Sequence, residues 1–162
     1  MPGMPPEWDD AWEIDHRFQA VQLIWPRETP DQEDPEIEQL TENDVPAMIE
    51  LTGLVYPAYF RPATAKLGAY FGIKRQDRLC AMAGIRMAME GLQEVSAVCT
   101  HPEFQGQGLA KRLVLHLVDF IQGTGDTPFL HTEADNVRAR TMYEKLGFHL
   151  RAEIDVTVVG RR

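Results

Sequence analysis

The stretch "THPEFQGQGLAKR" at residues 100–112 places two glycines among polar residues, between an apolar segment and a helical pattern. The preceding "LQEVSAVCT" at 92–100 alternates and then becomes continuously apolar, which is typical of a central strand. An amphipathic helix after the glycines is predicted by apolar residues four apart: Leu109, Leu113, Leu117 and Ile121. A strand, a glycine turn and a helix therefore follow one another here.

The glycine turn has the properties of an anion site. A helix N-terminus leaves about four N–H groups without intrahelical partners and carries the positive end of the helix dipole. Gly106 and Gly108 lack Cβ atoms, so the main chain can approach a phosphate closely. A dinucleotide fingerprint would need a third glycine where Lys111 stands, and a nucleoside-triphosphate loop would need Gly-Lys-Ser/Thr. The turn predicts a phosphate cradle of another type.

Composition narrows the class of protein. The chain has 162 residues, of which 44% are hydrophobic and 25% charged, which suits one globular domain. Residues 1–45 hold 13 Asp and Glu against 2 Arg, which leaves residues 46–162 at +2 within the net charge of -9. Because no basic stripe is present to neutralise phosphates, we expect no nucleic-acid partner.

Membrane association is not expected either. No apolar stretch approaches the roughly 20 residues that span a bilayer, and no basic segment followed by an apolar one begins the chain. Cys80 and Cys99 are the only cysteines, and each lies in an apolar run. This pattern favours buried thiols in a reducing cytoplasm over a disulfide framework or a metal site. We expect a soluble cytoplasmic protein.

The first 35 residues differ in character from the rest. Aromatic residues are frequent before residue 26, and "PRETPDQEDP" at 26–35 is acidic and contains three prolines, as linkers do. The segment "FQAVQLIW" at 18–25 predicts a strand or a packing arm, which would dock on the core or on a second copy of the chain in a homodimer. We therefore divide the chain into an extension and linker, 1–35, and a domain, 36–162.

Periodicity predicts a regular order of elements from residue 36 onward. An α/β (α+β) fold follows, with a mixed, mostly antiparallel sheet flanked by helices. The predicted elements are a strand at 36–40, a helix at 41–55, strands at 69–76, 80–88 and 92–100, a helix from 109, a strand at 129–134, a helix at 136–147 and a strand at 148–159.

Two motifs separated by one predicted strand carry a resemblance to a known family. The segment "QGQGLA" at 105–110 follows Gln/Arg-x-x-Gly-x-Gly/Ala, and "NVRARTMYEKLGF" at 136–148 follows Asn-x-x-Ala-x-x-x-Tyr-x-x-x-Gly-Phe. By these motifs the sequence resembles the GNAT superfamily of acyl-coenzyme A dependent N-acetyltransferases. The resemblance extends through the element order over about residues 36 to 158, with specific motifs only in the second half.

The resemblance implies acetyl-coenzyme A as co-substrate. The turn would wrap the pyrophosphate with main-chain amides, the central strand would pair with the pantetheine arm, and Asn136 would contact that arm. Such pairing requires neighbouring strands to splay, typically by a bulge. The implied coenzyme-binding residues are Val98, Cys99, Thr100, Gln105, Gly106, Gln107, Gly108, Leu109, Ala110, Lys111, Asn136 and Tyr143.

The resemblance also implies a catalytic arrangement that needs no metal. The Tyr143 hydroxyl would protonate the departing thiolate while a main-chain amide of the central strand polarises the carbonyl. Two residues compete for the amine's proton: Glu94, where histone-acetylating relatives carry a glutamate, and His131, where N-terminal-acetylating relatives carry one. A glutamate is the weaker base, whereas a histidine is suited to work near neutral pH. The sequence leaves both open.

The acceptor is less well defined. Tyr56, Tyr59 and Phe60 lie on the connection that often lines the acceptor pocket in the family, although three aromatics also suit a local core. We expect a small-molecule amine, with a protein N-terminus or lysine as the second candidate. Two further alternatives are a coenzyme A binding module without catalysis and an interaction domain whose glycine turn is only structural.

Overall fold

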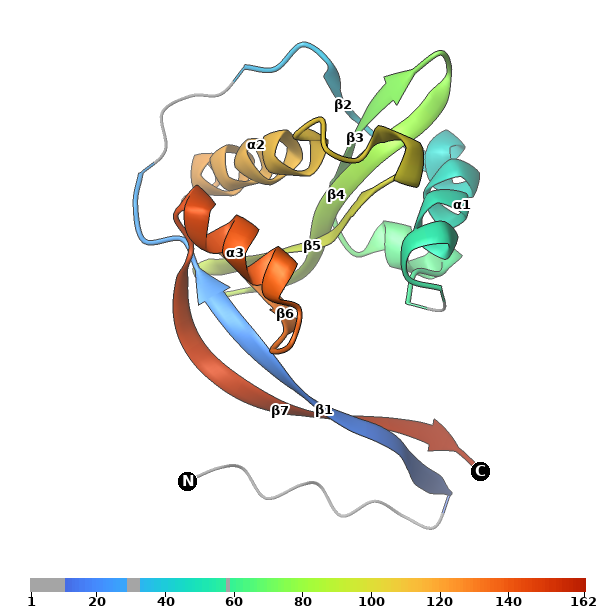
Figure 1. The fold of residues 1–162 in the computed structure, drawn as a ribbon, viewed down its shortest axis with the longest axis vertical. Helices are drawn as coiled ribbons and strands as arrows, with labels where there is room; N and C mark the ends of the chain where they lie inside the picture. Colours follow the sequence, from blue (N-terminus) through green and yellow to red (C-terminus); the bar gives the residue numbers. More distant parts are fainter. Residues whose placement is uncertain (1–10, 29–32, 58) are drawn as a thin grey trace.

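The computed structural model describes residues 11–28, 33–57 and 59–162. Within these ranges one sheet has the strand order β2-β3-β4-β5-β6-β1-β7 (Figure 1). Its strands are β1 (Trp12–Ile24), β2 (Ile37–Gln39), β3 (Tyr70–Arg75), β4 (Arg78–Met89), β5 (Leu92–Thr100), β6 (Thr127–Glu133) and β7 (His149–Arg161). The helices are α1 (Val45–Val55), α2 (Leu109–Gly123) and α3 (Val137–Leu146), with 3-10 turns η1 (Glu42–Asp44), η2 (Pro62–Lys66) and η3 (Pro102–Phe104).

The sheet is mostly antiparallel, as predicted. Every strand pair is antiparallel except β5 with β6, which run parallel. A parallel pair needs a crossover connection, and α2 supplies it. The glycine turn lies at the start of that crossover, between the end of β5 and the start of α2.

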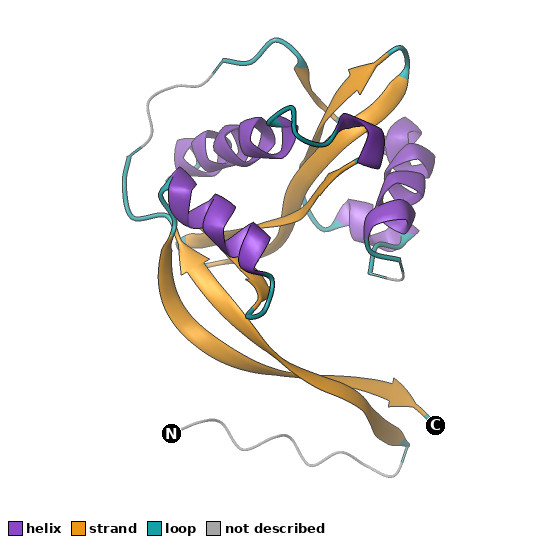
Figure 2. Ribbon diagram, in the orientation of Figure 1, coloured by secondary structure: helices purple, strands orange, loops and turns teal. Residues whose placement is uncertain are grey.

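Helices cover both faces of the sheet. Figure 2 shows α2 and α3 together on one side of the central strands and α1 on the other. On β4, Ala81 and Ala83 belong to the cluster that contains Leu113 of α2, whereas Met82 packs in the cluster that contains Met48 of α1. This alternation follows from the period of two in a strand, and it gives an apolar β4 a core on each side.

The two thiols lie on opposite faces of the sheet. Cys80 belongs to the α2 cluster and Cys99 to the α1 cluster, and both are free and buried. Burial raises the pKa of the Cys99 thiol to about 12. Within the described residues, no helix is long and apolar enough to cross a membrane.

The N-terminal segment contributes a strand inside the sheet. β1 lies between β6 and β7 and pairs antiparallel with both. Its second half is buried, and Leu23 is 0% exposed, whereas its first half forms with β7 a long two-stranded ribbon that extends from the body (Figure 1). The strand predicted at 18–25 is therefore present and begins earlier. A boundary after residue 35 stays a prediction, and Trp8, one of the aromatics before residue 26, lies outside the described residues.

Candidate active site

A bulge in β5 opens the sheet. Between β4 and β5 the register passes from Gly84↔Ser96 to Met82↔Cys99, so β5 contains one extra residue. Ala97, inside this interval, has a φ of 52°, in the left-handed region that a side chain rarely adopts. On the other side, β5 pairs with β6 only from Leu92 to Glu94. Beyond Glu94 the two strands are no longer paired, and the expected splay is present.

Two hollows open where the strands separate. The first, of about 480 Å³, lies beside the glycine turn, and we call it the loop hollow. It is lined by nearly all the coenzyme-binding residues expected from the sequence: Val98, Cys99, Thr100, Gln105, Gly106, Gly108, Leu109, Ala110, Lys111, Asn136 and Tyr143. The predicted residue Gln107 does not line it, because its side-chain oxygen accepts a hydrogen bond from Arg75 Nη1 at 2.5 Å.

The main chain of the loop forms a cradle of hydrogen-bond donors. The first helical bond of α2 runs from Arg112 N to Gly108 O, and the N–H groups of residues 106 to 111 donate to no acceptor among the described residues. Gly106 and Gly108 have φ of 78° and 74°, and a Cβ on either would meet no atom within 4 Å, so open space adjoins both. Thr100 Oγ1, also on this hollow, is buried without a partner in the described chain. These features fit a phosphate group and a polar arm beside it.

The acidic linker reaches the flank of the loop. Arg112 donates to both carboxylate oxygens of Asp34 at 2.6 Å, and its guanidinium lies 2.7 Å from Glu36. The hydrogen bond from Arg112 lowers the pKa of Asp34. Glu36 also lies 3.7 Å from Arg75. Neither Arg112 nor Arg75 lines the loop hollow, so an anion there would meet main-chain N–H groups rather than these two side chains.

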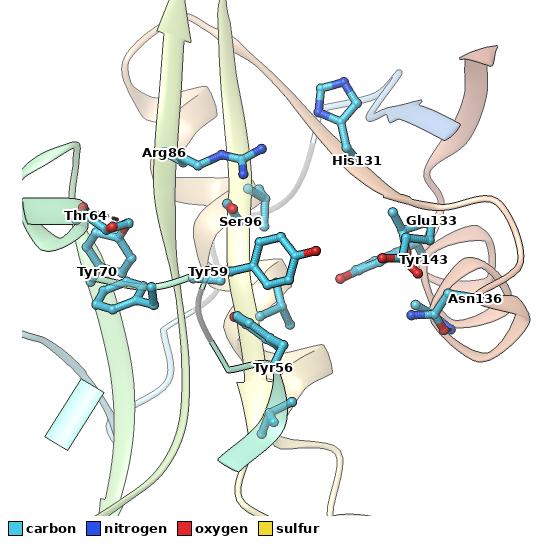
Figure 3. Close-up of a pocket in the computed structure, with 17 residues that line it drawn as sticks. Tyr56, Tyr59, Thr64, Tyr70, Arg86, Ser96, His131, Glu133, Asn136 and Tyr143 are labelled. Carbon is cyan, nitrogen blue, oxygen red and sulfur yellow. Dashed lines mark hydrogen bonds between the residues drawn. The ribbon is translucent and has the colours of Figure 1, made fainter. Parts of the chain in front are cut away.

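The second hollow, of about 500 Å³, carries the aromatic residues of the α1–β3 connection, and we call it the tyrosine hollow. Figure 3 shows Tyr56 and Tyr59 on one side, Arg86 and Ser96 on the strands, and Glu133 and Asn136 on the β6–α3 side. Phe60 also lines the hollow and is buried, whereas Tyr59 is 62% exposed. The three predicted acceptor residues therefore line one space.

Tyr143 and Asn136 line both hollows, so the two spaces adjoin one another at these residues. Asn136 caps α3 by accepting a hydrogen bond from Ala139 N at 3.1 Å. Tyr143 is 7% exposed, and its hydroxyl has no hydrogen-bond partner among the described residues. Burial raises the pKa of Tyr143 to about 12. The hydroxyl is therefore a protonated, unengaged donor at the junction of the hollows.

Glu94 is a buried carboxylate beneath the tyrosine hollow. It is 1% exposed and accepts hydrogen bonds from Arg86 Nε at 2.9 Å and Arg86 Nη2 at 2.7 Å, while His131 Nδ1 lies 2.8 Å from its Oε1. Burial alone would raise the pKa of Glu94, but the hydrogen bonds from His131 and Arg86 outweigh it, and the pKa lies below its ordinary value. Glu94 is thus ionised and does not line either hollow.

His131 lines the tyrosine hollow with both ring nitrogens engaged. Its Nε2 lies 3.0 Å from the side-chain nitrogen of Gln22, on β1, and the oxygen of that amide accepts from Arg151. With its oxygen occupied by an arginine, the Gln22 amide presents its N–H to His131 Nε2. The partners on both sides therefore fit a neutral ring with the proton on Nδ1, facing Glu94.

Comparison with known proteins identifies the family. A family model described as FR47-like protein matches residues 70–157. The fold superimposes with a TM-score of 0.89 on the crystal structure of a GNAT-family protein from Novosphingobium aromaticivorans, at 36% identity, covering 100% of this chain and 71% of that one. The chain belongs to the GNAT superfamily.

Curated GNAT relatives match different shares of the chain. A mycothiol acetyltransferase from Pseudarthrobacter chlorophenolicus is 42% identical over 64 residues, which are 39% of this chain and 20% of that protein. An N-alpha-acetyltransferase RimI from Mycobacterium tuberculosis is 29% identical over 131 residues, 74% of this chain and 82% of that protein. The chain therefore spans only about a fifth of the length of the mycothiol acetyltransferases that it matches.

Three residues of this GNAT site were not found by sequence reasoning. Arg86 is the one charge within the apolar segment "LCAMAGIRMAM" at 79–89 of β4, and its isolation there is a signal that the sequence offers. Glu133 lies two positions after His131, so strand alternation puts both on one face, and both line the tyrosine hollow. Gln22 carries no comparable signal, because its role depends on where β1 joins the sheet. The roles of Glu94 and His131 as bases stay predictions.

Proposed function

We propose that this protein transfers an acetyl group from acetyl-coenzyme A to the nitrogen of a small primary amine. The observation that carries the proposal is that Tyr143 lines both hollows. One of these hollows contains the loop with its free main-chain N–H groups, and the other contains aromatic and charged side chains. Membership of the GNAT superfamily supports acetyl transfer in general, and the two hollows suggest where each substrate enters.

The loop hollow would hold the coenzyme. The free N–H groups of residues 106 to 111 would bind its pyrophosphate, and the strand from Val98 to Thr100 would pair with its pantetheine arm. When bound, acetyl-coenzyme A supplies an acetyl thioester, whose carbonyl carbon accepts the amine. Asn136, which lines both hollows, would contact the arm near its reactive end.

Tyr143 would act as the general acid. The C–N bond forms as the C–S bond breaks, and the sulfur takes the proton of the Tyr143 hydroxyl, which solvent later restores. Because burial raises the pKa of Tyr143 to about 12, the hydroxyl remains protonated across the neutral range. The donor is therefore ready before each turnover.

Three groups compete for the proton that the amine loses. Glu94 and His131, the bases predicted from the sequence, are hydrogen-bonded to one another, and Arg86 also donates a hydrogen bond to Glu94. Glu133 lines the tyrosine hollow and has no side-chain partner among the described residues. We favour Glu133, directly or through a water. The pH profile of kcat/KM in Glu94→Gln, His131→Gln and Glu133→Gln identifies the base. The ascending limb is expected to shift only in the variant that lacks the base.

A small acceptor suits the size of the tyrosine hollow, which at about 500 Å³ lies in the usual range of small-molecule sites. One observation favours a second candidate, the α-amino group of a protein. The relative named N-alpha-acetyltransferase RimI aligns with 74% of this chain, a larger share than the mycothiol acetyltransferase does. The near-neutral charge of residues 46–162 offers no strong attraction for a basic peptide.

Two measurements test the proposal. Calorimetric titration with acetyl-coenzyme A is expected to give one site, and thiol release is expected with small amines from a panel that also contains peptides with free N-termini. Binding without thiol release from any acceptor would indicate a coenzyme-binding module. Absence of binding would indicate that the glycine turn is structural only. Faster turnover of peptides than of every small amine would select the second candidate.

A further inference from the structure

Arg86 uses only one edge of its guanidinium within the protein. Its Nε and Nη2 donate to the two oxygens of Glu94, while Nη1 has no partner among the described residues. The side chain is 45% exposed and lines the tyrosine hollow, whereas Glu94 behind it is 1% exposed. A guanidinium has five N–H donors in a planar fork, so a second edge remains available to the hollow.

The pair of Arg86 with the buried Glu94 also constrains the orientation of that free edge. Glu94 is held by three hydrogen bonds, from two atoms of Arg86 and one of His131, and His131 is held in turn by Gln22. A bidentate Arg–carboxylate pair constrains the guanidinium plane and lowers the entropy lost when the other edge binds a ligand. Arg86 is therefore pre-oriented for a planar anion, and a carboxylate matches its fork.

Glu133 supplies the opposite charge in the same hollow. It ends β6, and Figure 3 shows it on the β6–α3 side near Tyr143, across the hollow from Arg86. Since Glu94 and Arg86 neutralise one another, Glu133 is the unpaired carboxylate among the described lining residues. An ammonium at Glu133 would lie on the side of the hollow where Tyr143 would act.

We infer that the acceptor is an amine that also carries a carboxylate, with the amine at Glu133 and the carboxylate on the free edge of Arg86. This inference rests on the proposed function and specifies the substrate class for the same site. A simple alkyl- or arylamine would satisfy Glu133 and leave the donors of Arg86 to water. An amino-carboxylate satisfies both ends, and the apolar part of the molecule would contact Tyr56 and Tyr59.

Matched pairs of acceptors that differ only in the carboxylate test the inference. Two such pairs are phenylalanine with phenethylamine and 4-aminobutyrate with propylamine, which place amine and carboxylate at different separations. In at least one pair, kcat/KM for the acid is expected to exceed that for the decarboxylated amine by about tenfold or more. Calorimetry with protein saturated with coenzyme A is expected to give the same preference in affinity.

Variants locate the preference on Arg86. Arg86→Gln alone would leave Glu94 buried without its cation, so the double variant Arg86→Gln/Glu94→Gln serves as a second, charge-balanced test. In both variants the acid and its decarboxylated partner are expected to bind equally, with the affinity for coenzyme A retained. The control is Lys145→Gln, which removes an exposed cation outside both hollows and is expected to retain the preference.

Glu133→Gln separates the two ends of the acceptor. It is expected to weaken both members of each pair alike, because both carry the amine, whereas Glu144→Gln, on the exposed part of α3, weakens neither. The inference is overturned if decarboxylated amines bind and react as well as their acids in both pairs, or if the preference survives in the double variant. Failure of acetyl-coenzyme A to bind at all would instead contradict the proposed function.

If acetyl-coenzyme A binds and none of the four amines is acetylated, the calorimetric comparison decides the inference. Tighter binding of an acid, lost in the double variant, supports it. Equal or absent binding of acids overturns it.

Discussion

The two hollows that meet at Tyr143 are built in different ways. The loop hollow is lined by one short stretch of the chain, Gly106 and residues 108 to 111, whose main-chain N–H groups are free at the start of one helix. The tyrosine hollow presents side chains from four separate parts of the chain, represented by Tyr56, Arg86, Ser96 and Glu133. The first offers a surface that depends on backbone conformation, and the second offers one that depends on residue identity.

This difference suggests that the loop hollow suits the coenzyme and the tyrosine hollow suits the acceptor amine. A pyrophosphate can be bound by main-chain dipoles whatever side chains the loop carries, provided that glycines permit the conformation. An acceptor has to be distinguished from similar amines, and that requires side chains with particular charges and shapes. Backbone changes should therefore impair the loop hollow, and side-chain changes the tyrosine hollow.

The largest effect is expected where the hollows join. Tyr143→Phe removes only the hydroxyl, so turnover should fall by about 100-fold or more while the affinity for acetyl-coenzyme A remains. Single-turnover kinetics and calorimetry measure the two quantities separately. Full activity would mean that solvent protonates the thiolate, and a parallel loss of coenzyme affinity would assign Tyr143 to the loop hollow alone.

A large stability effect is expected beneath the tyrosine hollow. Glu94→Gln removes the buried carboxylate that Arg86 and His131 hold, and the free energy of unfolding at neutral pH should fall by about 2 kcal/mol. Glu133→Gln, on the open side of the hollow, should stay within about 0.5 kcal/mol of the wild type. Urea unfolding measures both. Equal losses of unfolding free energy in the two variants would contradict a structural role for Glu94 and a substrate-facing role for Glu133.

The same variant has a pH signature. The folded-state pKa of Glu94 lies below its ordinary 4.5, so its ionised form contributes stability that is present above about 4.5. That contribution is lost as the pH falls through the folded-state pKa. Urea unfolding from about pH 7 to 3 should therefore show a steeper acid loss in the wild type than in Glu94→Gln. Part of the loss should persist, because the pKa values of Asp34 and Asp44 are also lowered by their cationic partners.

A backbone change in the loop hollow should have an intermediate effect. Gly108 has a φ of 74°, and a side chain there would point into open space beside the loop. Gly108→Val should weaken acetyl-coenzyme A binding by about tenfold or more, about 1.4 kcal/mol. Gly123→Val, at the other end of α2, is the control, since a Cβ there also meets no atom within 4 Å and φ is not positive. Unchanged affinity in Gly108→Val would contradict a main-chain cradle.

The smallest effect is expected from a side chain that braces the loop. Arg75 donates to Gln107 across an exposed hydrogen bond of 2.5 Å. Arg75→Ala should weaken coenzyme binding by about two- to threefold, less than 1 kcal/mol, as is usual for exposed charged contacts. Arg162→Ala, which breaks an exposed pair with Glu13 away from both hollows, should leave the affinity unchanged. A loss as large as that of Gly108→Val would show that side chains matter as much as the backbone here.

Most of the fold followed from local patterns. From residue 36 onward the order of strands and helices matches the structure, because alternation and helical spacing are properties of short segments. The location of β1 did not follow. Its sequence predicts a strand or an arm, but its insertion between β6 and β7 depends on pairing with residues more than 100 positions away, such as Gln22 with His131.

In the site, too, features formed by consecutive residues followed from the sequence, whereas contacts between separate strands did not. The sequence by itself determined the loop hollow, since the glycines, the helix start and the strand before it are consecutive, and consecutive residues set main-chain geometry. It also predicted Tyr143 and Asn136 through a contiguous motif. Only the tertiary structure decided that Glu94 is hydrogen-bonded to Arg86 and His131, and that Glu133 and Arg86 line the same hollow. Side chains from separate strands meet only through the register of the whole sheet, and a bulge at Ala97 changes that register without a signal in the local pattern.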